Sequence, residues 1–126
     1  MTRKIFAFTL ILFAAALIGG SPAWANKAAV SIEAPKTAAK GSEIVIRVTA
    51  THSRNSSYHH IEWLWIKVNG KEVGRWDYTG DHLPEGATFT KEIKWKVDGN
   101  VEIRAKANCN LHGSKGEGRA TVKAKE

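Results

Sequence analysis

The sequence predicts an all-β protein, an antiparallel β-sandwich of immunoglobulin type with about seven strands, preceded by a cleavable signal peptide. Apolar residues recur with a period of two over most of residues 26–126, and no helical stripe of apolar residues appears there. Turn signals separate the apolar segments, among them Asn69-Gly70 and Asp98-Gly99, which favour tight hairpins with positive φ. The expected strands cover residues 30–32, 44–50, 61–68, 74–78, 87–97, 101–107 and 120–125.

The alternation within single strands predicts which side chains face the core. In the segment 101–107 the inward set is Val101, Ile103, Ala105 and Ala107. In the segment 87–97 it is Phe89, Ile93, Trp95 and Val97. The segment 61–68 is apolar on both faces, with Ile61, Trp63 and Trp65 on one and Leu64, Ile66 and Val68 on the other. We therefore expect this strand to be central and its tryptophans to pack in the core or near the site.

The first 25 residues predict an export signal. Arg3 and Lys4 precede an apolar run over residues 5–18, and the small-residue triplet Ala23-Trp24-Ala25 follows. The run is shorter than the roughly 20 residues that a membrane-spanning helix needs. We therefore expect cleavage after residue 25, no retained membrane anchor, and an exported, periplasmic protein with one domain over residues 26–126.

The amino-acid composition excludes several domain organisations and classes of function. The chain has 126 residues, with 19 Lys and Arg against 12 Asp and Glu, so two large domains are excluded and the charge is moderately basic. No basic run carries interleaved aromatic residues, so nucleic acid is not an expected partner. Cys109 is the single cysteine, so an exported form has no internal disulfide. Its thiol must then be buried, paired with another chain or bound to a metal.

The histidines gather near the ends of the expected strands. Cys109 and His112 lie three residues apart on one short loop, which brings a thiolate and an imidazole close enough to share an ion. His52 and His59 lie in or beside the loop that connects two earlier strands. These four residues form a candidate metal site. For the two remaining histidines, His60 and His82, a solvated polar role is the simpler interpretation.

Two segments about fifty residues apart resemble a known family. His59-His60-Ile61-Glu62-Trp63 and Cys109-Asn110-Leu111-His112-Gly113 are similar to the ligand segments of superoxide reductase, the iron-binding domain of desulfoferrodoxin and neelaredoxin. The resemblance covers essentially all of residues 26–126. It implies an immunoglobulin-like sandwich holding one mononuclear iron ion, Fe²⁺ or Fe³⁺, through four equatorial histidines and one axial cysteine. It also implies reduction of superoxide to hydrogen peroxide, with electrons from an external electron-donor protein.

Carried over by position, the resemblance implies four metal ligands in this chain, which are His52, His59, Cys109 and His112. Lys27 matches a lysine that attracts superoxide in the family. The chain departs from the family where a further ligand histidine is expected, because Ala28 stands there. Water, an asparagine side chain or His82 could fill the vacant position. Water is preferred, since nothing in the sequence places His82 near the site.

Three functional hypotheses follow. The first is a superoxide reductase-like oxidoreductase. The second is a non-catalytic module that binds iron, zinc or copper on the same sandwich, which the alanine at position 28 favours. The third is a blue-copper electron carrier, which commonly uses a methionine downstream of its cysteine, whereas the only methionine here is Met1. The sequence identifies neither the electron donor nor the oligomeric state.

Overall fold

The computed structural model describes residues 27–126, and this part of the chain is all-β, as predicted. The expected signal peptide, residues 1–25, lies outside the described residues. Within residues 27–126, no helix is long and apolar enough to span a bilayer. The strands are β1 (Ala29–Glu33), β2 (Thr37–Ala39), β3 (Glu43–Thr51), β4 (Ile61–Val68), β5 (Lys71–Asp77), β6 (Thr88–Lys96), β7 (Val101–Cys109) and β8 (Gly118–Lys125).

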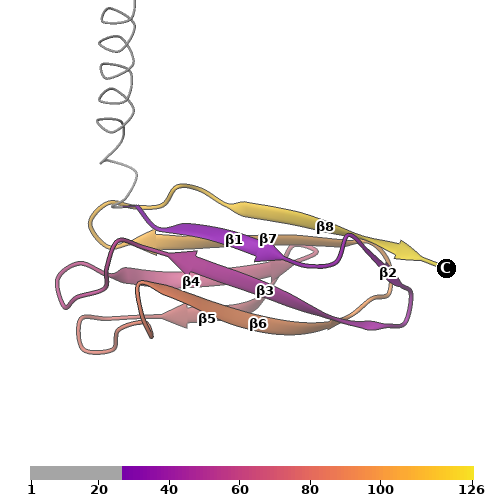
Figure 1. Cartoon of the computed structure of the whole chain (residues 1–126), viewed down its shortest axis with the longest axis horizontal. Helices are drawn as coiled ribbons and strands as arrows, with labels where there is room; N and C mark the ends of the chain where they lie inside the picture. Colours follow the sequence, from indigo (N-terminus) through magenta and orange to yellow (C-terminus); the bar gives the residue numbers. More distant parts are fainter. Residues whose placement is uncertain (1–26) are drawn as a thin grey trace, which may run out of the picture.

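The strands form two sheets that pack as a sandwich (Figure 1), which confirms the predicted fold class. One sheet has the order β1-β3-β6 and the other the order β2-β8-β7-β4-β5. Neighbouring strands pair antiparallel, except that the short β2 pairs parallel with β8. The strand β2 was not among the expected segments. Its three residues, Thr37–Ala39, carry too little alternation to mark a strand in the sequence.

The core lies between the sheets and is built by the strands with the clearest alternation. Along β7 every second residue is buried, from Val101 to Cys109. The facing strand β3 buries Ile44, Ile46, Val48 and Ala50. Each such aliphatic side chain contributes about 1.5–3 kcal/mol when it leaves water. The predicted inward set of β7 thus shares one core with the buried side chains of β3.

Strand β4 is paired on both sides, by β7 and β5, as predicted. Its tryptophans differ from the expectation, because Trp63 and Trp65 lie on the outer face and are only partly buried. The cations Lys67 and Arg75 lie 4.5 Å from the Trp65 ring and 5.6 Å from the Trp63 ring, respectively. A register shift between Ile61 and Trp63 explains why Ile61 is fully buried and does not share the outer face.

Of the two predicted tight turns, the structure contains the one at Asn69-Gly70 and not the one at Asp98-Gly99. Asn69 and Gly70 both have positive φ, 51° and 81°, so the β4–β5 hairpin turns as predicted. Neither Asp98 nor Gly99 has a positive φ. Strand β6 ends at Lys96 and β7 begins at Val101, so the connection is longer than two residues and does not need a left-handed turn.

Three loops and the start of β1 meet at one end of the sandwich (Figure 1). The loops connect β3 to β4, β5 to β6 and β7 to β8, and backbone hydrogen bonds join them. The backbone amide of His52 donates to Ala87 O, and the backbone amide of Ala28 donates to Gly113 O.

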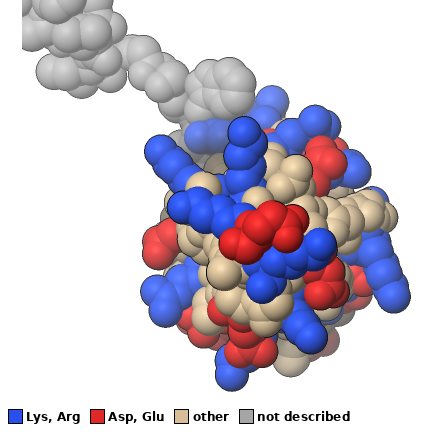
Figure 2. Space-filling model, turned by 90° about the vertical axis from the view of Figure 1, so that its right-hand side faces the viewer, with Lys and Arg blue, Asp and Glu red and all other residues tan. Residues whose placement is uncertain are grey.

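Figure 2 shows the opposite end, where lysines and arginines alternate with acidic residues instead of forming one basic patch. The cations on this end therefore belong to a solvated surface of mixed charge.

Tyr78 is a buried core residue whose hydroxyl forms no hydrogen bond within residues 27–126. Burial raises the pKa of the Tyr78 phenol to about 12, and the negative charge of Glu85 adds to the shift. We predict that Tyr78→Phe leaves the free energy of unfolding at pH 7 unchanged or raises it by about 1 kcal/mol, because an unpartnered buried hydroxyl is costly.

The same substitution tests the alkaline stability. The pKa of Tyr78 in the folded protein exceeds the ordinary tyrosine value of 10.0, so this contribution to stability is fully present below pH 10 and is lost as the pH rises through about 12. Between pH 10 and pH 12 the free energy of unfolding of the wild-type protein should fall by about 2 kcal/mol more than that of the Tyr78→Phe variant. Denaturant unfolding at pH 7 and pH 11.5 measures the difference. An equal alkaline loss in both proteins would contradict the assignment.

Candidate metal centre

Cys109 stands at the last inward position of β7, where the alternation of the strand directs its thiol toward the core. Its side chain is 2% exposed. The chain turns back immediately, because Cys109 and Gly113 exchange two backbone hydrogen bonds of 2.9 and 3.0 Å, and Gly113 adopts a φ of 78°. This closed loop returns His112 to the thiol, with its amide 3.4 Å and its Nδ1 3.9 Å from Sγ.

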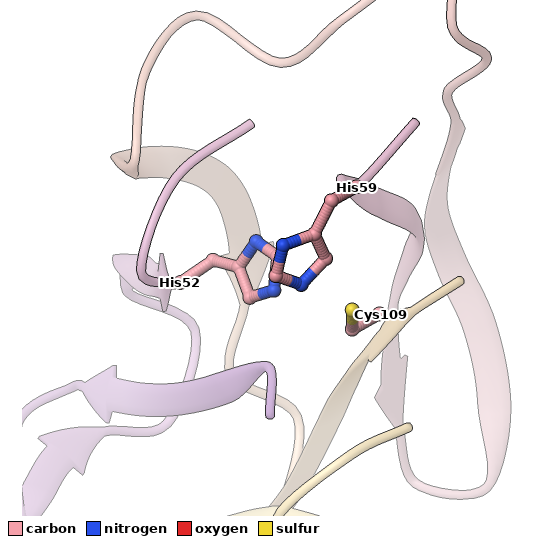
Figure 3. Close-up of side chains that lie close together, drawn as sticks. All are labelled: His52, His59 and Cys109. Carbon is pink, nitrogen blue, oxygen red and sulfur yellow. The ribbon is translucent and has the colours of Figure 1, made fainter. Parts of the chain in front are cut away.

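His52 and His59 reach the thiol from the other side of the sandwich end. His52 directly follows β3 and is 4% exposed, and His59 lies two residues before the start of β4 and is 9% exposed. Their rings meet edge to face with centroids 4.7 Å apart. Donor atoms of His52, His59 and Cys109 all lie within 4.8 Å of one another, and Figure 3 shows the three side chains converging.

His112 completes the donor cluster. Its Nδ1 lies 3.1 Å from Nε2 of His59, and the two ring centroids are 4.8 Å apart. Two nitrogen ligands at adjacent positions of one ion, each about 2.1 Å from it, are separated by about 3 Å. The structure therefore brings together all four residues that the sequence singled out as ligands. Three imidazoles and one thiolate form a donor set that fits iron, zinc or copper.

Ala28 lies directly against the loop that carries His112. Its amide donates to Gly113 O at 3.1 Å, and its carbonyl accepts from the amide of Lys115 at 2.8 Å. The residue is fully buried, yet its methyl group offers no donor atom. Lys27, the expected superoxide-attracting lysine, precedes it and therefore lies at the same end of the sandwich.

The other two histidines behave differently from each other. His82 is exposed, and its ring stacks on Tyr78 with centroids 6.1 Å apart, so the structure does not bring it into the donor cluster. His60 is 6% exposed, so the expectation that it is solvated was wrong. Its Nδ1 lies 3.0 Å from Ser56 O, and this hydrogen bond closes the loop that carries His59. A buried polar ring needs such a partner.

Two asparagines near the site were missed by the sequence analysis. Asn55 Oδ1 accepts from the amide of Ile61 at 2.8 Å, and its Nδ2 donates to Gly86 O at 2.8 Å. Asn110, between Cys109 and Leu111, bonds across to the segment that carries His59. Asparagine is common in loops, so neither residue carries a pattern that distinguishes it in the sequence.

Comparisons with known proteins show the fold and the family of this chain. No match was found among curated proteins. A solved superoxide reductase (neelaredoxin) from Ignicoccus hospitalis is 23% identical, with a TM-score of 0.56, and the match covers 85% of this chain and 89% of that one. A putative superoxide reductase from Thermotoga maritima is 21% identical, with a TM-score of 0.54, covering 78% of this chain and 86% of that one.

The same sandwich occurs in other proteins. A CARDB domain from Pyrococcus furiosus, solved in complex with di-metal ions, has a TM-score of 0.60 at 13% identity, covering 78% of this chain and 87% of that one. At these identities the structural matches establish the fold alone. The family model for desulfoferrodoxin, by contrast, matches residues 23–115, a stretch that contains all four donor residues. This chain therefore belongs to the desulfoferrodoxin family.

Proposed function

We propose that this chain is an exported mononuclear iron protein that reduces superoxide to hydrogen peroxide. The observation that carries the proposal is the convergence of three imidazoles and the only thiol at one end of the sandwich, where His52, His59 and Cys109 are buried and the exposed His112 closes the cluster from outside. The reaction adds one electron and two protons to each superoxide. An external electron-donor protein would supply one electron for each turnover.

The side chains suit this chemistry. Neutral imidazoles bind iron without cancelling its charge, and the Cys109 thiolate donates electron density. Iron held by His52, His59, Cys109 and His112 would supply the single electron that superoxide takes up. The His112 amide, 3.4 Å from Sγ, donates a hydrogen bond to the sulfur, and such a bond tunes how strongly a thiolate donates to a metal.

Charge near the site supports an anionic substrate. Lys27 and Lys115 flank the contact between Ala28 and the loop that carries His112. The segments 52–60 and 109–116 contain no Asp or Glu but carry Arg54 and Lys115, whereas the β5–β6 loop at the same end carries Asp81 and Glu85. A net positive field at this end would draw superoxide toward the donors.

Export to the periplasm is part of the proposal. It rests on the signal pattern of residues 1–25. In an oxidising compartment a lone thiol is open to unwanted oxidation or pairing. Burial of Cys109 among three imidazoles is compatible with such a compartment.

The first prediction concerns the thiolate. Protein loaded anaerobically with Fe²⁺ should hold one iron per chain, consume superoxide, and show a thiolate-to-ferric charge-transfer band when oxidised. Cys109→Ser should erase the band and lower superoxide consumption at least tenfold, because oxygen replaces the sulfur donor. Metal analysis, visible spectra and pulse-generated superoxide measure these effects, with circular dichroism as the control for folding. A band that survives the substitution would refute the role of Cys109.

The second prediction concerns Lys27. Lys27→Ala should lower the rate constant for superoxide consumption several-fold at low ionic strength, because a cation near the site steers the anion. The difference should shrink as salt is added. Lys125→Ala is the matched control and should change the rate little, because Lys125 is the last residue of β8, which ends beside the C-terminus at the opposite end of the sandwich (Figure 1). Equal effects of the two substitutions would show that Lys27 has no specific part in attraction.

A second candidate function is a metal-binding module without turnover. The buried Ala28 favours it, because a family ligand position carries no donor atom. Four donors of the types present also bind zinc tightly. On this hypothesis the iron-loaded protein consumes no superoxide.

The corresponding prediction is a strong response to zinc. At a free Zn²⁺ concentration one thousand times the Kd, the free energy of unfolding should rise by about 4 kcal/mol, since the ion binds the folded chain. His59→Ala should remove most of this gain. Calorimetry with and without Zn²⁺ measures it, and superoxide consumption by the iron-loaded protein then separates the two functions.

A further inference from the structure

We infer that Asn110 is a positioning residue that holds His59 in place beside Cys109. The inference rests on the proposed metal centre, because it assigns Asn110 the task of setting the distance between two of its donors. Asn110 touches neither superoxide nor an ion in this role. It acts through the backbone on both sides of His59.

The side chain of Asn110 brackets His59. Its Oδ1 accepts a hydrogen bond of 3.0 Å from the amide of His60, and its Nδ2 donates one of 3.1 Å to Tyr58 O. The Asn110 amide also donates to His60 O at 3.0 Å. One residue, adjacent to the thiol in sequence, thus bonds the residue before His59 and the residue after it.

Strand pairing does not supply this restraint. The ladder between β4 and β7 reaches Ile61 and Cys109, but its register shifts between Ile61 and Trp63. His59 lies two residues beyond the end of that ladder. The neighbouring Tyr58 is 86% exposed, so core packing does not anchor the chain there. Besides the contact between the His59 and His112 rings, the hydrogen bonds to Asn110 join the backbone on both sides of His59 to the cysteine loop.

The position of Asn110 also couples the two loops. Its Oδ1 lies 4.0 Å from Sγ of Cys109. A shift of the carboxamide would therefore change the surroundings of the thiol together with the position of His59. Ligand sites depend on such supporting contacts, whose loss typically weakens metal binding 10–100-fold.

The test uses Asn110→Ala in the full domain, titrated anaerobically with Co²⁺ alone while the thiolate-to-cobalt charge-transfer band is followed. The Kd for Co²⁺ should rise 10–100-fold. Asn100→Ala is the matched control, because it removes one hydrogen bond in a different loop, which the amide of Ala124 donates to Asn100 Oδ1. Its Kd should stay within about twofold of the wild-type value, even if both variants lose similar stability.

A second readout needs no metal. In the metal-free Asn110→Ala protein, the amide of His60 should exchange hydrogen faster, while amides in the middle of β4 keep their protection. If the alanine variant fails to fold, Asn110→Gln keeps the carboxamide but displaces it by one methylene, and it should still raise the Kd several-fold.

The outcomes separate the two proposals. A wild-type protein that shows no thiolate band with Co²⁺ refutes the metal centre and the positioning role with it. A wild-type protein with the band, together with an Asn110 variant that binds Co²⁺ like Asn100→Ala, refutes the positioning role alone. Unchanged exchange of the His60 amide in Asn110→Ala would also overturn it.

Discussion

The site depends on one constraint, the alternation of β7. Because every second residue of this strand faces the core, Val101 at its beginning places Cys109 at its end on the same buried face. The thiol is therefore presented by a strand that is paired on both sides, between β8 and β4. A shift of this strand by one residue would turn the thiol out of the core together with the whole inward set. The apolar packing that stabilises the sandwich thus also determines where the sulfur lies.

The histidines come from loops, and loops need other restraints. Burying imidazoles at the end of an apolar core is costly unless their polar atoms and the surrounding backbone find partners. Here the side chains of Asn55, Ser56 and Asn110 accept hydrogen bonds from the amides of Ile61, His59 and His60, respectively. Polar side chains therefore hold the histidines of this loop in position, whereas strand pairing holds Cys109 in position. Ala28 adds a further backbone contact to the loop of His112, without contributing a donor atom.

Much of the fold could be predicted because its signals are local. The alternation of β7 and the Asn69-Gly70 turn each act within a few residues, and both were confirmed. The outer position of Trp63 and Trp65 was not predicted, because an apolar residue on a strand does not reveal whether the opposite face will be covered by another sheet. The register shift at Ile61 depends on how β4 meets β7, which no stretch of β4 alone encodes.

The sequence by itself determined the strand pattern, the single thiol and the three-residue spacing that returns His112 to it, since these follow from alternation and short-range geometry. The sequence also grouped His52 and His59 with these two residues as a candidate metal site, and the resemblance of two segments to a known family supported that grouping. Only the tertiary structure decided that His60 is buried, that His82 stacks on Tyr78, and that Ala28 and Asn110 contact the ligand loops. The contact between Ala28 and Lys115 joins residues 87 positions apart. Which distant loops meet is set by the packing of the two sheets, and that packing is a property of the whole chain.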